Sequence, residues 1–173
     1  NNYYIDLGRT RGILPKAEII PGEEIKMGSN IKVYITKVEN NTKGPLIMLS
    51  RKHYGFVKRL FEQEIPEIIN GDIEIYAVVR EAGVRSKVAV FTNNEKIDPI
   101  GSCIGEKGSR IAGILKELGN ERVDLVIYNE DDGLYYMFYC TSSTWNASNL
   151  CYGVAEKPEG PYEWKGALLY SGF

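Results

Sequence analysis

The sequence is poor in the residues from which metal sites and nucleophilic catalytic sites are usually built. Its 173 residues include one histidine, His53, and three cysteines, Cys103, Cys140 and Cys151. The spacing of the cysteines fits no metal-ligand pattern, and their odd number argues against a disulfide framework. We therefore expect no bound metal, no cofactor and no catalytic residue, and we expect His53 to have a packing or surface role.

The sequence also lacks a long apolar run and an excess of positive charge. No segment approaches the roughly 20 apolar residues that span a bilayer, and the polar start Asn1-Asn2 is unlike a signal peptide. We therefore expect a soluble, cytoplasmic protein without a membrane partner. The formal net charge of −2 argues against indiscriminate binding to duplex nucleic acid, but it leaves room for a locally basic surface that binds a single strand.

The composition changes near residue 130. Residues 131–173 hold ten of the 19 aromatic side chains, with both tryptophans, Trp145 and Trp164, among them. Residues 1–130 hold 19 basic and 18 acidic side chains, whereas residues 131–173 hold two and five. Such a shift is typical of a domain boundary or of a join between unrelated sequences.

Residues 1–52 have the short apolar segments and polar turns of a small β-barrel. A turn at Gly8 is expected to separate the first two strands. Alternating residues at 31–36 predict a half-buried strand, and the turn-rich stretch 40–45 before the next apolar run predicts a hairpin. We expect an OB-fold-like barrel up to about residue 51.

Residues 53–130 predict helices and strands in a defined order. An amphipathic helix is expected from about residue 54, and Pro66 limits its length. Asp98-Pro99 should open a later helix, because aspartate caps helices and proline fits the first turn. The remaining elements are strands at about 73–80 and 86–92, the loop Gly105-Glu106-Lys107-Gly108, a helix with apolar residues at helical spacing from Ile111 to Leu118, and a strand at about 123–127.

Two helices joined by Gly-x-x-Gly on a three-stranded sheet describe a KH domain, and this order is that of type II. Glycines at 105 and 108 let the backbone approach sugar and phosphate, and the start of the next helix favours an anion. Lys107 and Arg110 add positive charge, whereas Glu106 opposes it. Unstacked bases would lie over apolar side chains and the 123–127 strand.

A GxxG tetrapeptide alone often marks a plain turn, so its setting decides the interpretation. Here two predicted helices and apolar residues flank the loop, which favours the KH interpretation. The expected partner is single-stranded RNA, and the expected contact residues are Ile104, Gly105, Glu106, Lys107, Gly108, Ser109, Arg110 and Ile111.

Longer segments resemble the bacterial NusA transcription factors. The segments REAGVRSKVAV (80–90) and DPIGSCIG (98–105) resemble the first KH domain of that family. The segment LGRTRGILP (7–15) resembles the preceding OB-fold barrel of the ribosomal-protein type, and FEQEIPEI (61–68) resembles the linker between them. The resemblance covers about residues 1–130.

This resemblance implies an RNA-binding factor for transcription pausing, termination and antitermination that works on RNA polymerase and is not an enzyme. The family's polymerase-binding N-terminal domain, the first strand of its barrel and its second KH domain have no counterpart in the sequence. Polymerase is therefore expected as a partner only through the parent protein. On the barrel, the candidates for RNA contact are Tyr4, Arg9, Arg11 and Tyr34, although the tyrosines could equally pack on the barrel and the arginines be solvated.

Residues 131–173 resemble one blade of the β-propeller in glycoside hydrolase family 43, the arabinanases and xylosidases. The segments that show this resemblance are DGLYYMFY (132–139), GVA (153–155) and EGPYEW (159–164), and three strands are expected. Aromatic residues can stack on sugars, but these are expected to be strand residues that pack between blades, so carbohydrate is a poor candidate partner. Because the family draws its catalytic carboxylates from several blades, no catalytic role is assigned here.

The expected fold class is α+β: an incomplete OB-fold barrel, a type II KH domain and a β-rich C-terminal segment of about three strands. The expected divisions are residues 1–52 for the barrel, 53–70 for a linker helix, 71–130 for the KH domain and 131–173 for a foreign segment. The tail strands could cover the incomplete barrel or extend a sheet edge. The alternative function is an artificial chimera with a carbohydrate-active segment and no retained activity.

Overall fold

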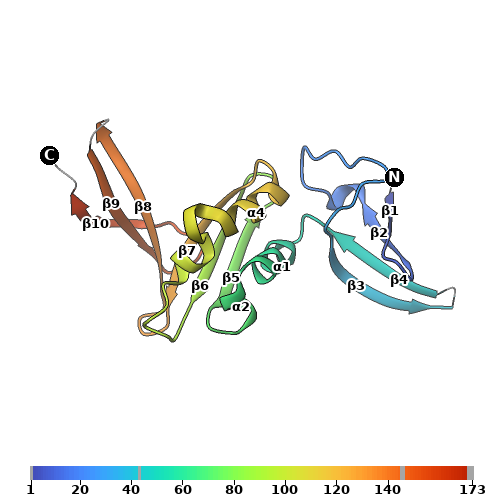
Figure 1. Ribbon diagram of the computed structural model, residues 1–173, viewed down its shortest axis with the longest axis horizontal. Coiled ribbons are helices and arrows are strands. Elements are labelled where there is room, and N and C mark those ends of the chain that lie inside the picture. Colours follow the sequence, from blue (N-terminus) through green and yellow to red (C-terminus); the bar gives the residue numbers. More distant parts are fainter. Residues whose placement is uncertain (1, 43, 145–146, 171–173) are drawn as a thin grey trace.

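The chain forms two sheets with a helical connection, and its fold class is α+β as predicted. The computed structural model describes residues 2–42, 44–144 and 147–170. The N-terminal strands (blue to cyan) and the C-terminal strands (orange to red) lie at opposite ends of the molecule, with α1 between the two sheets (Figure 1). Within the described part of the chain, no helix combines the length and apolar character that crossing a bilayer requires.

The N-terminal sheet has four strands in the order β1-β2-β4-β3. They are β1 (Asn2–Asp6), β2 (Arg11–Pro15), β3 (Tyr34–Asn41) and β4 (Gly44–Ser50). The predicted turn between β1 and β2 contains Gly8 at φ 91°, and the Asp6 carboxylate accepts a hydrogen bond from its N–H at 2.9 Å. A small core centres on Leu14 and Leu49. The edges β1 and β3 do not pair with each other, so the sheet is open, as expected for an incomplete barrel.

The limits of β3 differ from the prediction. The alternating residues at 31–36 predicted a strand there, but β3 begins at Tyr34 and continues to Asn41. Ile31 and Val33 reach the core from irregular backbone, whereas Ile35, inside the strand, is 49% exposed. The apolar pattern therefore identified residues near the core without fixing their backbone conformation.

Two helices connect the sheets: α1 (Tyr54–Glu64) and α2 (Pro66–Ile69). The His53 Nδ1 atom caps α1 by accepting a hydrogen bond from the Gly55 N–H at 3.0 Å, which gives this histidine the expected structural role. The apolar face of α1 includes Phe56 and Phe61, both buried. Proline at 66 begins α2, and the predicted limit on α1 is confirmed.

The KH sheet comprises β5 (Glu74–Glu81), β6 (Arg85–Phe91) and β7 (Arg122–Asn129). β5 and β6 are antiparallel, whereas β6 and β7 are parallel. Between β6 and β7 the chain forms α3 (Pro99–Ile104), a 3₁₀ turn (Glu106–Gly108) and α4 (Ser109–Leu118). The helices cover one face of this sheet, where Val88, Val90 and Ile114 belong to one buried cluster with residues of α1.

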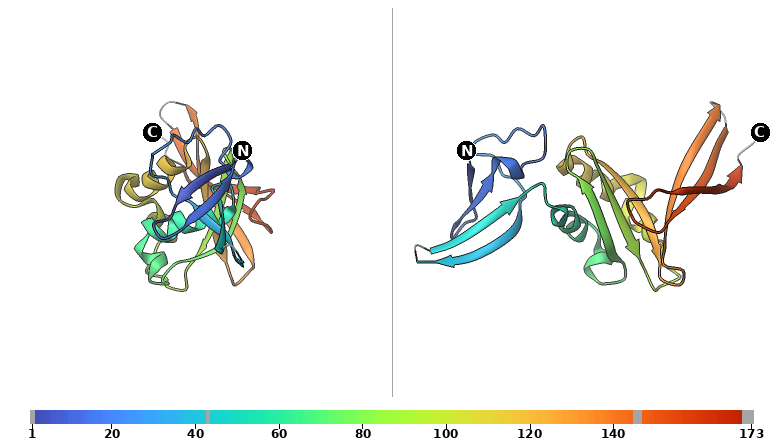
Figure 2. Two further views of the ribbon diagram at one scale, coloured as in Figure 1. Left: turned by 90° about the vertical axis from the view of Figure 1, so that its right-hand side faces the viewer. Right: turned by 180° about the vertical axis from the view of Figure 1, so that it is seen from behind.

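Three tail strands continue the KH sheet beyond β7: β8 (Leu134–Thr144), β9 (Ala147–Ala155) and β10 (Glu163–Tyr170). The sheet order becomes β10-β9-β8-β7-β6-β5, so the tail extends a sheet edge and does not join the N-terminal sheet. Seen from behind, the tail strands remain at the far side of the KH sheet from the N-terminal strands (Figure 2). Tyr135 and Tyr162 pack with Ala89 and Val126 on the sheet face opposite the helices.

Removal of residues 131–173 tests the contribution of this contact. The truncation exposes Ala89 and Val126, which are fully buried in the intact chain. We expect the free energy of unfolding to fall by about 2–3 kcal/mol, roughly the value of burying one or two large apolar side chains. Chemical denaturation of the truncated and full chains measures this difference, and equal stability would show that the tail does not support the KH sheet.

Candidate nucleic-acid interface

The GxxG segment lies between α3 and α4, as predicted. The Asp98 carboxylate caps α3 by accepting a hydrogen bond from the Ile100 N–H at 3.1 Å, and Pro99 occupies the first turn. The helix ends at Ile104, where the Gly105 N–H donates to the Gly101 carbonyl at 2.9 Å. These contacts fix the direction in which the chain enters the loop.

The backbone of the loop is left-handed at three of its four positions. Gly105 has φ 74° and ψ 173°, Lys107 has φ 51° and ψ 27°, and Gly108 has φ 78° and ψ 15°. The first of these conformations is open almost only to glycine. A Cβ atom at Gly105 would also lie 2.7 Å from the Cγ atom of Arg110, whereas a Cβ at Gly108 would meet only Ile111, at 3.9 Å.

The two glycines are therefore expected to differ in their tolerance of alanine. Gly105→Ala should lower the free energy of unfolding by about 1–3 kcal/mol, because it adds a clash to a glycine-only backbone conformation. Gly108→Ala should cost less, about 1–2 kcal/mol, because its left-handed conformation is less restrictive and the space beside it is open. Parallel urea titrations of the two variants measure the difference. A loss of unfolding free energy in Gly108→Ala that equals or exceeds the loss in Gly105→Ala would contradict the loop geometry.

The two cations predicted at the loop have different surroundings. Lys107 is exposed, and within the described residues its ammonium has no hydrogen-bond or ion-pair partner. The Arg110 guanidinium donates to the Glu67 carboxylate and to the Ser102 carbonyl, both at 2.7 Å. The pKa of the Glu67 carboxyl group lies below its usual range. The main cause is a hydrogen bond from the backbone N–H of Glu67 itself, and the hydrogen bond from Arg110 adds to it. Arg110 thus links α4 to α2 and α3, and Lys107 is the cation available to a phosphate.

The other loop residues predicted to contact RNA are accessible to different extents. Glu106 and Ser109 are exposed, Ile104 is 38% exposed, and Ile111 is half-buried against the core. The neighbouring strand β7 starts and ends slightly outside the predicted limits of 123–127. Its edge away from β6 pairs with β8 over residues 127–129, and within the described part of the chain the 122–126 part of this edge has no strand partner.

The four residues of the N-terminal sheet that were predicted to contact RNA lie at two separate places. Tyr4 and Arg11 lie on the same face of the β1–β2 hairpin, because Arg11 pairs with Asp6, two positions along from Tyr4. Arg9 is exposed in the adjoining turn, and the Tyr4 ring is 68% exposed. Tyr34 lies on β3, the opposite edge, where its ring stacks on His53 at 5.0 Å.

The contacts that hold the two sheets together were not predicted. The buried Arg51 guanidinium donates two hydrogen bonds to the Glu23 carboxylate, at 2.5 and 2.8 Å, and two to Glu117 of α4, at 2.7 Å to its carboxylate and 3.3 Å to its carbonyl. Arg80 of β5 donates to the Arg51 carbonyl at 2.9 Å, and it is held in place by a bidentate pair with the fully buried Glu121, with both N–O distances 2.9 Å. The acidic partners lie far from Arg51 and Arg80 in the sequence, so no local pattern predicts these pairs. The apolar residues around Arg51 are the only sequence signal of its burial.

Comparison with known proteins matches two families to residues 2–128 of this chain. The S1 RNA binding domain family matches residues 2–51, and the NusA-like first KH domain family matches residues 51–128. The transcription termination/antitermination protein NusA of Halalkalibacterium halodurans is 51% identical over 128 residues, or 74% of this chain and 34% of the relative. The same protein of Bacillus subtilis is 50% identical over 128 residues, with the same coverage, and that of Thermus thermophilus is 47% identical over 130 residues, 75% of this chain and 34% of the relative.

The chain spans about a third of the length of these relatives. Within that span the order of domains agrees with the observed fold, in which the open N-terminal sheet precedes the helix-covered KH sheet. Residues 2–128 therefore form an S1 domain, of the OB-fold class, followed by a KH domain.

Proposed function

We propose that this chain binds single-stranded RNA as part of a transcription termination and antitermination factor. The observation that carries the proposal is the left-handed GxxG loop of a NusA-like KH domain, with the unpaired Lys107 at its tip. The loop binds a phosphate through Lys107 and the first backbone N–H groups of α4, which no side chain caps.

The bases then lie beside the loop, over Ile104, Ile111 and the edge of β7. The bases are unstacked from one another here, as the recognition of single-stranded RNA requires. The β1–β2 hairpin supplies a second contact, in which Tyr4 stacks on a base while Arg9 and Arg11 approach phosphates. Stacking on one aromatic ring contributes about 1–3 kcal/mol and tolerates different bases.

The setting of this activity follows from the relatives, which are named as transcription termination/antitermination proteins. The longer protein works on RNA polymerase in the cytoplasm, without a cofactor or a catalytic residue of this chain. The functional divisions are the S1 domain at 1–52, a linker helix at 53–70, the KH domain at 71–130 and the appended strands at 131–173. The resemblance of these strands to a glycoside hydrolase blade stays a prediction, and carbohydrate has no part in the proposal.

A binding titration tests the proposal. A fluorescent single-stranded RNA of about 12 nucleotides is titrated with the chain and with its Glu106→Asp/Lys107→Asp variant at two salt concentrations. The variant should bind at least about tenfold more weakly, because one charge-assisted contact is lost, and its affinity should depend less on salt. The Lys165→Asp variant, which changes an exposed lysine of β10, is the control for net charge. Equal binding by the loop variant and the parent would contradict the proposal.

A further inference from the structure

A cavity of about 470 Å³ lies where the KH sheet meets the tail strands. Residues 127–129 of β7 pair with residues 134–136 of β8, and the last of these pairs joins Ile127 to Tyr136. From Met137 onward, β8 pairs with β9 and no longer with β7. The two strands therefore diverge, and the cavity lies in the fork between them. Residues 92–95, Ile97 and the first residue of α3, Pro99, line its remaining side.

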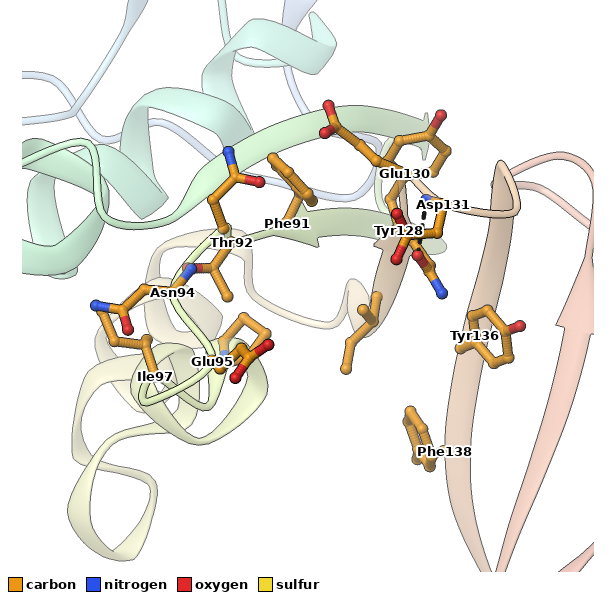
Figure 3. Close-up of a pocket in the computed structure, with 14 residues that line it drawn as sticks. Phe91, Thr92, Asn94, Glu95, Ile97, Tyr128, Glu130, Asp131, Tyr136 and Phe138 are labelled. Carbon is orange, nitrogen blue, oxygen red and sulfur yellow. Dashed lines mark hydrogen bonds between the residues drawn. The ribbon is translucent and has the colours of Figure 1, made fainter.

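The walls of the cavity combine aromatic and aliphatic side chains with polar ones in about equal share. In Figure 3, Tyr136 and Phe138 of β8 face Glu95 and Ile97 across the cavity. The Tyr136 hydroxyl donates to the Asp132 carboxylate at 2.5 Å, which fixes the orientation of this ring. The Phe138 ring is 39% exposed, and its centroid lies 6.4 Å from that of the stacked Tyr152 ring on β9.

The charges of the cavity exclude a phosphate and favour a hydrogen-bond donor. None of the 14 lining residues is a lysine or an arginine, whereas three are acidic: Glu95, Glu130 and Asp131. The Glu95 carboxylate has no hydrogen-bond or ion-pair partner within residues 2–42, 44–144 and 147–170. A carboxylate only accepts hydrogen bonds, so its complement is a group that donates.

The cavity is connected to the GxxG loop by α3. This helix begins at Pro99, which lines the cavity, and ends at Ile104, beside Gly105. Six helical residues extend about 9 Å, so an RNA strand whose phosphate is bound at the loop reaches the cavity within a few nucleotides. The sugar–phosphate backbone can then stay outside the acidic rim while one base enters.

We propose that this cavity binds an unstacked cytosine or adenine between Phe138 and Glu95, because these two bases carry an exocyclic amino group where uracil and guanine carry a carbonyl oxygen. The amino group donates to Glu95, and the base lies against the Phe138 ring. Uracil is disfavoured, since it presents a carbonyl oxygen where cytosine presents the amino group. This inference rests on the proposed function, because it takes the base from the same RNA strand that the GxxG loop binds.

Cytosine and uracil provide the sharpest test, because the two bases have the same size and differ in the group opposite Glu95. Labelled oligocytidylate and oligouridylate of about 12 nucleotides are titrated with the full chain by fluorescence anisotropy. We expect the cytidine strand to bind about tenfold more tightly. In Glu95→Gln this ratio should approach one, because the amide can also donate to the uracil carbonyl. Phe138→Ala should weaken cytidine binding roughly 5- to 150-fold through loss of stacking.

Two matched variants on β10, outside the cavity, serve as controls: Glu163→Gln and Trp164→Ala. Both should bind the two strands as the parent does. An equal affinity of the parent for both strands, or an unchanged ratio in Glu95→Gln, would overturn the inference. So would cytidine binding by Phe138→Ala equal to that by Trp164→Ala. Glu95 is exposed, so its variant tests the inference even if Phe138→Ala folds poorly.

The same titrations separate this inference from the proposed function. The Lys107→Asp variant should bind both strands more weakly without changing the ratio between them. If Lys107→Asp weakens binding but no cavity variant does, the cavity inference fails and RNA binding at the loop stands. If Lys107→Asp binds like the parent, the proposed function itself fails.

Discussion

Replacing Arg80 with methionine is expected to lower the free energy of unfolding by about 3–5 kcal/mol. The substitution leaves the Glu121 carboxylate without its charged partner, and Glu121 is buried immediately before β7. It also removes the hydrogen bonds from Arg80 to the Arg51 and His53 carbonyls, at 2.9 and 2.8 Å. Chemical denaturation followed by circular dichroism measures the loss.

The double variant Arg80→Met/Glu121→Leu is the control for this prediction. Because both charges are then absent, most of the lost stability should return. A double variant as unstable as Arg80→Met would show that packing of the arginine, and not the unpaired carboxylate, causes the loss.

The same pair gives stability a defined dependence on pH. Burial alone would raise the pKa of Glu121, but hydrogen bonds from Arg80, Ser86 and the Gly83 N–H outweigh it and lower the pKa below 4.5. The stabilisation is therefore complete above about pH 4.5 and is lost as the pH falls through the lower, folded-state pKa. In Glu121→Gln this acid-dependent part of the unfolding free energy should be absent.

Replacing Arg51 with methionine is expected to cost about 3–5 kcal/mol and to loosen the S1 domain from the KH domain. Arg51 is 2% exposed and joins Glu23, which follows the 3₁₀ turn Lys16–Glu18 of the S1 domain, to Glu117 of α4. It also donates to the Lys32 carbonyl at 2.5 Å. Its loss leaves two carboxylates without their cation, and within residues 2–42, 44–144 and 147–170 it removes the only ion pair between that domain and α4.

Limited proteolysis and thermal unfolding measure the two effects of Arg51→Met. We expect cleavage between residues 16 and 53 to become faster than cleavage within the KH domain, with a lower midpoint of unfolding. Arg51→Lys is the matched control, and it should recover part of the stability because lysine keeps the charge but not the bidentate geometry. Equal cleavage rates in the parent and Arg51→Met would show that the two domains are held together by other contacts.

Local sequence patterns predicted the elements whose causes are local. The apolar spacing from Ile111 to Leu118 predicted α4, and the Asp98-Pro99 pair predicted the start of α3. The GxxG tetrapeptide located the left-handed loop, because glycine is the residue that such a backbone requires. Each of these signals acts within a few residues of the structure that it determines.

The features that were missed depend on residues far apart in the chain. Arg110 was predicted to add positive charge beside the loop, and its ion pair with Glu67, 43 positions earlier, was not predicted. Extension of a sheet edge by the tail was one of two alternatives, and the choice between them depends on the pairing of Ile127 with Tyr136, which no local pattern specifies. The cavity beside Phe138 exists because β7 and β8 diverge there, and divergence of two strands has no sequence signal of its own.

Backbone amide spectra of the ¹⁵N-labelled chain during titration with single-stranded RNA test the central claim most directly. If the GxxG loop binds the RNA backbone, the largest chemical-shift changes should fall on the amides of Gly105, Lys107, Gly108 and Ser109, with smaller changes along β7. These changes should diminish in the Glu106→Asp/Lys107→Asp variant at the same RNA concentration. Unchanged loop amides at saturating RNA, with the shifts confined to the S1 domain or to β9 and β10, would contradict the account.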